Sequence, residues 1–231
     1  DILAFTTTQL GALTAAQIGA LTTAQIGTLT TTQLSAFSAA SMAGLKSTQI
    51  TGLSATQLDP LSATQIAAFS TIGIKALTQT QVSALATTQL TALTTLQFAA
   101  LVDTQIESLT TTQIAALTTT QIANLNAATL SSISTTQIAA LTTTQMGALS
   151  TTDIGLLTED QISALTATQI AAFSTTQLGA LSVAAVGLLS ASDITALNTS
   201  QIAALTAAQI AAFNTTQMAA LTTTQVVALT V

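Results

Sequence analysis

The sequence predicts an all-α repeat solenoid, in which each eight-residue repeat forms one very short capped helix. Every eighth residue from Phe5 to Leu229, here called the leucine row, is Leu, Phe or Ile in 29 of 29 repeats. Every eighth residue from Ile2 to Val226, the isoleucine row, is also always apolar, and no insertion shifts the register. The residue after each leucine-row position is Ser, Thr or Asn in 26 of 29 repeats. These residue types are the best helix N-caps, so the repeat predicts a regular series of helix starts.

Residues 117–124 carry the local signals of a helix N-terminus. Thr118 is followed three residues later by Gln121, the spacing of a capping box. Leu117 and Ile122 occupy the two positions of a hydrophobic staple around that cap. The glutamine position, here called the glutamine row, is Gln in 22 of 29 repeats. Three of its exceptions are Asp, an anion suited to the positive end of a helix.

The helices must be short, because a new cap follows after eight residues. We expect about five to seven residues in each helix, a length that is stable only when neighbours pack against it. Nine of the ten glycines, and also Pro60 and Asn124, lie one or two residues before the leucine row. These residue types favour bends, so they predict the corners of a spool-like coil. We favour three helices, and therefore three repeats, for each turn of this coil over four.

A β-solenoid is the alternative, because Thr and Ile favour strands. The leucine and isoleucine rows are five and then three residues apart, and an odd spacing puts them on opposite faces of a strand. The cap signals also favour helices. We therefore expect residues 1–231 to form a single continuous array, and its mid-repeat ends suggest a segment of a longer one.

The composition argues against several classes of partner. Charged residues make up 4% of the chain, its net charge is −6, and Lys46 and Lys75 are its only cations. Binding of nucleic acid or of an anionic membrane needs a basic surface, so we expect neither. We expect no membrane insertion, because Thr and Gln interrupt every apolar run.

We predict no catalytic, cofactor-binding or metal-binding residue, and hence no enzyme. The chain has no His and no Cys, so its many hydroxyl groups have no partner base. Asp153, Glu159 and Asp160 lie close together in sequence but lack the glycine-containing loop of a calcium site. Asp103 and Glu107 have a helical spacing but the same charge.

Other polar and sulfur-containing residues fit structural roles. Met42, Met146 and Met218 stand on the isoleucine row, where core packing explains them. Asn198 and Asn214 match the N-glycosylation pattern, but both stand at the cap position. The two residues after each cap should face outward as rows of Thr, Ser and Ala. Such a surface could bind glycans, ice or another filament, although we favour simple solvation as its role.

The repeat resembles a known class of bacterial sequence. Three stretches show the pattern well: Leu13–Ile18 (Leu-Thr-Ala-Ala-Gln-Ile), Leu141–Met146 and Leu205–Ile210. It is similar to low-complexity arrays in very large bacterial extracellular proteins, labelled adhesin-like or haem utilisation or adhesion proteins. The resemblance implies a secreted or surface-attached protein and carries over no binding residue. The absence of His, Cys and Tyr gives the haem label no support here.

These observations predict a structural extracellular protein that forms a rigid stalk or a self-assembling filament of a bacterial surface or matrix. The alternative is an adhesin module that binds a glycan or a surface through its Thr and Ser face. The first and last repeats resemble the middle ones, whereas solenoids usually end in polar capping repeats. We therefore expect the chain to associate with itself end to end, without a cofactor.

Overall fold

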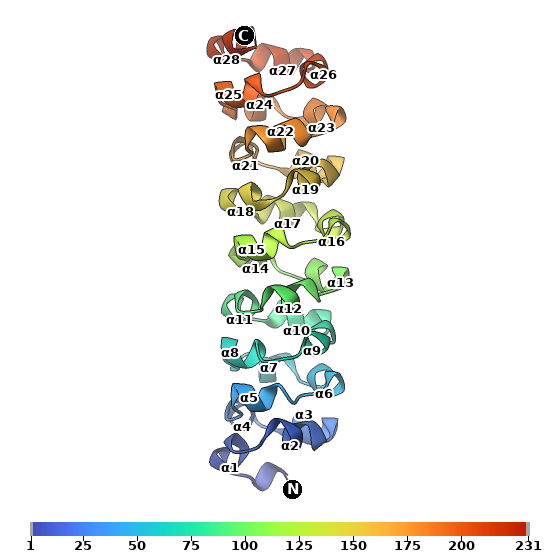
Figure 1. Ribbon diagram of the computed structural model, residues 1–231, viewed down its shortest axis with the longest axis vertical. Coiled ribbons are helices and arrows are strands. Elements are labelled where there is room, and N and C mark those ends of the chain that lie inside the picture. The colour runs from blue at the N-terminus through green and yellow to red at the C-terminus, as the bar shows by residue number, and fades with distance from the viewer. Residues whose placement is uncertain (1, 230–231) are drawn as a thin grey trace. The chain divides into compact units, whose positions relative to one another are not determined.

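The computed structural model describes residues 2–229, and its regular secondary structure in this range is entirely helical. It contains one short 3₁₀ helix and 28 α-helices of four to six residues each, joined by tight corners (Figure 1). No β-strand occurs within residues 2–229. The predicted all-α repeat solenoid is therefore confirmed, and the β-solenoid alternative has no support.

The chain divides into two compact units, Asp1–Leu117 and Thr118–Val231, which are described separately. The prediction of a single array over residues 1–231 stays a prediction. The helices of unit 1 are η1 (Ile2–Ala4), α1 (Thr7–Gly11), α2 (Ala15–Ala20), α3 (Thr23–Thr28), α4 (Thr31–Ser35), α5 (Ala39–Met42), α6 (Ser47–Thr51), α7 (Ala55–Leu58), α8 (Ala63–Ile66), α9 (Thr71–Lys75), α10 (Gln79–Ala84), α11 (Thr87–Thr91), α12 (Thr95–Ala99), α13 (Asp103–Glu107) and α14 (Thr111–Ala116). Those of unit 2 are α15 (Thr119–Ala123), α16 (Ala127–Ser132), α17 (Thr135–Ala140), α18 (Thr143–Ala148), α19 (Thr151–Leu156), α20 (Glu159–Ala164), α21 (Ala167–Ala171), α22 (Thr175–Ala180), α23 (Val183–Leu188), α24 (Ala191–Ala196), α25 (Thr199–Ala203), α26 (Ala207–Ala211), α27 (Thr215–Ala220) and α28 (Thr223–Ala228).

The predicted capping box starts most of these helices. At α14 the Gln113 backbone N–H donates to the Thr110 hydroxyl at 3.1 Å, and the Thr110 N–H donates to Gln113 Oε1 at 2.8 Å. Thr110 has an extended backbone (φ −71°, ψ 158°), as a cap requires. At Lys46, Ala86 and Val102 the cap side chain accepts no hydrogen bond. The glutamine half of the box remains at all three of these caps.

The corners form without left-handed residues. Leu85 and Ala86, between α10 and α11, are both extended, and two such residues turn the chain from one helix to the next. No described residue has a positive φ. The corners therefore lie where the glycines predicted them, but the backbone angles of these bends do not require glycine. Gly44 has a different role, because a Cβ atom there would overlap the backbone of Ala15 in the preceding coil. That glycine allows two coils to approach closely.

Three helices make one turn of the coil, as favoured from the sequence. Helices whose numbers differ by three contact each other, such as α2, α5 and α8 in unit 1 or α15, α18 and α21 in unit 2 (Figure 1). Because α2 begins at Ala15 and the helix stacked on it, α5, begins at Ala39, one turn takes three repeats. Each helix in the middle of a unit therefore packs between the helices of the coil before it and the coil after it.

The two apolar rows form the core of each unit. Ile50, Ile66 and Ile74 on the isoleucine row have no exposed surface, and Leu53 and Leu61 on the leucine row are 3% exposed. Burial of such side chains stabilises the fold by about 1.5–3 kcal/mol each. The apolar rows therefore supply the cohesion that the individual helices lack.

Candidate functional site

The glutamine row joins each coil to the coil before it. Gln113 Nε2 donates to the carbonyl oxygens of Val82 and Leu85, at 3.0 and 2.8 Å. In unit 2, Gln161 Nε2 makes the equivalent bonds to Leu130 and Ile133, both at 2.8 Å. In both cases the acceptors lie in the last turn of a helix and in the following corner, one coil earlier. We call this recurring set of bonds the glutamine ladder.

Each ladder glutamine uses both ends of its amide. Its oxygen accepts the N–H of its own helix cap, and its nitrogen donates to the preceding coil, as Gln113 does. These side chains are buried; Gln49 is 1% exposed and Gln65 is 7% exposed. Glutamate could complete the capping box but has no donor for the carbonyls when ionised. The ladder therefore explains why glutamine, and not glutamate, occupies this row.

Only the first of these two roles of glutamine was predicted from the sequence. The sequence does contain a signal for the second role. If capping were the only role of this row, Glu should occur there, because both Glu and Gln complete a capping box and an acid is favoured near a helix N-terminus. Glutamate nevertheless never occupies this row, whereas Gln occupies it in 22 of 29 repeats. That bias indicates that the side chain must also donate a hydrogen bond.

Three departures from glutamine keep part of its role. Ser41 donates from its hydroxyl to the carbonyl of Leu13 at 2.6 Å, so it retains the bond between coils. Asp153 Oδ2 accepts from the N–H and the hydroxyl of Ser150, at 2.9 and 2.7 Å, so it retains the cap. Asp193 repeats this arrangement with Ser190. A carboxylate completes the box but cannot donate to the coil before it.

We expect the replacement Asp153→Gln to stabilise unit 2. By the register of the ladder, the new amide would donate to the carbonyls of Ile122 and Leu125 in the coil before it. Making this bond and removing a 9% exposed carboxylate should raise the free energy of unfolding by about 1 kcal/mol. Denaturant titration measures the change, and Asp160→Asn, which alters an exposed acid on α20, is the control. A loss of stability in Asp153→Gln would contradict the ladder at this site.

The first coil of unit 1 has glutamines with no earlier coil among the described residues. Gln9, Gln17 and Gln25 are exposed, although each accepts its own cap N–H like the buried members of the row. Leu3 and Phe5 beside them are 44% and 42% exposed. This surface, here called the amide face, thus presents hydrogen-bond donors and apolar side chains.

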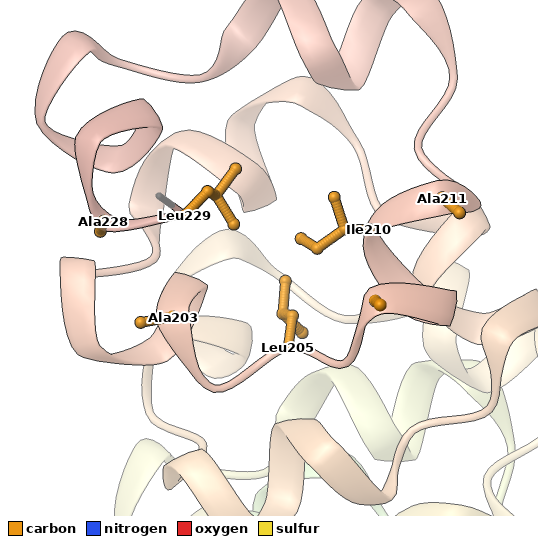
Figure 2. Close-up of a pocket in the computed structure, with 7 residues that line it drawn as sticks. Ala203, Leu205, Ile210, Ala211, Ala228 and Leu229 are labelled. Atoms are coloured by element: carbon orange, nitrogen blue, oxygen red, sulfur yellow. The ribbon is translucent and has the colours of Figure 1, made fainter. Parts of the chain in front are cut away.

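The last coil of unit 2 presents a different surface, here called the carbonyl face. Met218 and Val226, on the isoleucine row, are 48% and 47% exposed. An apolar pocket of about 480 Å³ is lined by residues of α25, α26 and α28 and of the corners beside them, and Figure 2 shows Leu205, Ile210 and Leu229 directed into it.

The methionines and the glycosylation-pattern asparagines named from the sequence lie at core and helix-cap positions. Met42 and Met146 are fully buried in the core, as expected, but Met218 is half exposed, so core packing does not account for it. Asn198 and Asn214 cap α25 and α27 with their side chains.

The acidic residues are dispersed. Glu159 and Asp160 are exposed in the first turn of α20, whereas Asp153 is buried at the start of α19. Asp103 and Glu107 lie at opposite ends of α13. Among the described residues, His, Cys, Asp and Glu form no group of three or more that could hold a metal ion. Within the same residues, no helix has the length and apolar character needed to traverse a bilayer.

The repeat unit described above matches one family model. The ALTTAQ repeat model matches residues 1–31, 82–119, 119–151, 170–207 and 196–231, which together make up more than half of the chain. The chain belongs to the ALTTAQ repeat family. Residues 20–25 read Ala-Leu-Thr-Thr-Ala-Gln, so an ALTTAQ unit contains a leucine-row residue, a helix cap and a glutamine-row residue. No curated protein matches the chain.

Proposed function

We propose that this chain is a structural protein, a stiff spacer in a stalk or filament outside a bacterial cell, and not an enzyme. The observation that carries the proposal is the glutamine ladder, which joins successive coils by the same bonds in both units. A solenoid held by identical contacts between neighbours extends without limit as coils are added. Such an architecture suits a protein whose role is to span a distance.

The ladder favours stiffness over flexibility. Each ladder amide is buried and bonded to backbone atoms of another coil, so bending between coils would break hydrogen bonds that water cannot easily replace. Where two coils meet, three glutamine positions lie around the axis, one on each helix. Tilting in any direction is therefore opposed by at least one of them.

The sequence resemblance supports an extracellular location, and the surface charge bears on which partners the chain could bind. The resemblance to large bacterial extracellular proteins favours the cell surface or the matrix. The net charge of −6 and the presence of only two lysines argue against nucleic acid and anionic lipid as partners. The role needs no cofactor.

Distances between pairs of fluorescent labels test the stiffness. The chain has no Cys, so introduced cysteines give specific labelling. One label at Thr120 (α15) is paired with a second at Thr144 (α18), Thr168 (α21) or Thr216 (α27). All four residues are exposed, and their helices belong to one column of successive contacts in unit 2, α15, α18, α21, α24 and α27. Energy transfer should give narrow distributions whose mean grows by an equal step for each coil. Broad distributions would contradict a stiff spacer.

The location has its own test. Antibodies against the chain should label intact cells of a bacterium that carries it as strongly as permeabilised cells. Labelling that requires permeabilisation would contradict the extracellular role.

An adhesin is the second candidate, favoured by the exposed hydroxyl rows. Thr120, Thr144 and Thr168 project from three stacked helices and form one uncharged row. If this row binds glycans, changing all three residues to Lys should abolish retention on a glycan array. The control carries lysines at Thr136, Thr152 and Thr216, one on each of the three sides of the coil. Equal retention of both variants, or no retention of the parent, would contradict the adhesin.

A further inference from the structure

We propose that unit 2 contains a hinge at one turn of its coil, formed by α22, α23 and α24 (Figure 1), and that this turn tilts away from the turn before it in one direction. We call these three helices the hinge turn. The inference goes beyond the spacer role proposed above, because it states where and how such a spacer would bend.

Two consecutive members of the glutamine row cannot join the coils at this turn. The row is Gln in 22 of 29 repeats, and Ala185 and Asp193 are the only departures that follow one another directly. Alanine has no polar group in its side chain, and an ionised carboxylate has no hydrogen to donate. By the register of the ladder, the carbonyls of Leu157 and Leu165 therefore receive no amide from the glutamine row.

The third position of the hinge turn keeps its bonds. Gln177 Nε2 donates to Met146 O at 3.0 Å and to Leu149 O at 2.7 Å. Because three helices make one turn, the three positions lie at three corners around the axis. A tilt that opens the corners of Ala185 and Asp193 thus breaks no ladder bond, whereas the Gln177 corner stays joined and acts as the pivot.

Solvent reaches the coil at the two corners without ladder bonds. Leu157 and Leu165 are 9% and 7% exposed. Leucine-row residues that accept a ladder bond in the same unit are more buried: Ile133, Leu141 and Leu149 are 2%, 3% and 3% exposed. The missing bonds therefore coincide with looser packing between the coils.

A single departure in unit 1 is closed by packing instead. Gly73 also has no side chain that could donate, but the Ile50 side chain occupies the space that a Cβ atom of Gly73 would need. Leu45, whose carbonyl stands in the ladder register of Gly73, is only 3% exposed. The hinge turn differs because it combines two adjacent missing bonds with access of solvent to both corners.

The turn after the hinge turn is joined to it at all three corners. Gln209 donates to Leu181 at 2.8 Å and Gln217 donates to Leu189 at 2.7 Å, and Gln201 makes the third set of bonds. The helices from α22 onward therefore move together, and the tilt occurs at the junction before them. Each buried hydrogen bond favours a closed junction by roughly a factor of five, so two missing bonds raise the open population by about 25-fold relative to the next junction.

Pairs of spin labels on introduced cysteines measure the opening of each corner, in urea concentrations below the unfolding transition of unit 2. The hinge pair, Thr168 and Ser192, spans the junction beside Asp193, and the pivot pair, Thr152 and Thr176, spans it on the other side. All four residues are exposed, and the helices of each pair are in contact. We expect the hinge pair to lengthen at low urea while the pivot pair keeps its distance.

A matched pair spans the next junction, which has all its ladder bonds. Ser192 and Thr216 lie on the contacting helices α24 and α27, beside the bonded Gln217. We expect this pair to lengthen only at higher urea than the hinge pair, because opening there would break ladder bonds.

Two double variants test whether the missing bonds cause the difference. Ala185→Gln with Asp193→Gln restores the amides, and it should shift the lengthening of the hinge pair to the urea concentration of the matched pair. The reverse variant, Gln209→Ala with Gln217→Asp, removes the same two bonds from the next junction. It should make the matched pair lengthen as early as the hinge pair does in the parent.

The inference would be overturned if the hinge pair and the matched pair lengthened together in the parent, or if the restored variant left the hinge pair unchanged. Lengthening of the pivot pair together with the hinge pair would refute a tilt in one direction. The fluorescent label distances of unit 2 test the spacer separately, in the absence of urea. Broad fluorescent distances in a chain whose hinge pair still opens first would refute the spacer and leave the hinge intact.

Discussion

Replacing Gln113 by glutamate is expected to lower the free energy of unfolding of unit 1 by about 3 kcal/mol or more. Gln113 is 3% exposed, and its Nε2 lies 3.0 and 2.8 Å from the carbonyl oxygens of Val82 and Leu85. Glutamate has nearly the same size and keeps the oxygen that accepts the Thr110 N–H. The second carboxylate oxygen would face two carbonyl oxygens without a proton between them. A buried charge would thus replace two hydrogen bonds.

The same substitution at Gln17 is the matched control. Gln17 makes the same capping box with Thr14 but is exposed in the first coil of unit 1. Its carboxylate would lie in the first turn of a helix, where an anion is favoured. We expect Gln17→Glu to change stability by less than about 0.5 kcal/mol in denaturant titration of the monomer. Equal losses at the two sites would show that glutamine is needed only for the cap and would refute the ladder.

The loss at Gln113→Glu should also depend on pH. Burial beside carbonyl oxygens raises the pKa of the introduced carboxyl above its usual value of about 4.3. The folded variant therefore binds a proton more readily than the unfolded chain, and its unfolding free energy falls as pH rises through that window. Relative to the parent, the variant should regain stability as pH is lowered from about 7 to about 4, because a protonated carboxyl can donate to one carbonyl. Gln17→Glu should show no such recovery.

Local features of this fold could be predicted from the sequence, because a single repeat contains them. The cap, the box and the two apolar rows are interactions within one helix and its corner, as in Thr110 and Gln113. The number of helices per turn was only a preference, since it depends on contacts between helices three repeats apart. Those contacts repeat with nearly the same residues in every coil, so the sequence contains little variation that marks which repeats touch.

The glutamine ladder and Gly44 show why the contacts between coils could not be predicted from the sequence. Gln113 looks complete as a cap partner, and its second set of bonds is made to Val82 and Leu85 in another coil. In the sequence, Gly44 suggests a bend that needs glycine, but its φ angle is not positive. Glycine is needed there because a Cβ atom would overlap the backbone of Ala15 in another coil. In both cases a local explanation was available and hid the contact between coils.

The substitution Ile122→Asp on the isoleucine row is expected to cause the second large loss of stability. Ile122 has no exposed surface, so the aspartate would replace an apolar side chain in the core by an unpaired charge. We expect the stability of the surrounding helices to fall by about 4 kcal/mol or more. Thr120→Asp, which alters an exposed residue in the first turn of the same helix, is the control and should be nearly neutral.

The form of that loss distinguishes a solenoid from an ordinary domain. In a repeat array, the free energy of unfolding is approximately the sum of the stability of each repeat and of the contacts between neighbouring repeats. A substitution in one helix therefore destabilises mainly the helices that contact it. Hydrogen exchange of Ile122→Asp should therefore accelerate in α15 and in α18, which contacts it, and much less in α24 to α28. Uniform loss of protection across unit 2 would mean that the unit unfolds as one cooperative body. Unchanged exchange in α15 would mean that the isoleucine row is not the core of the coil.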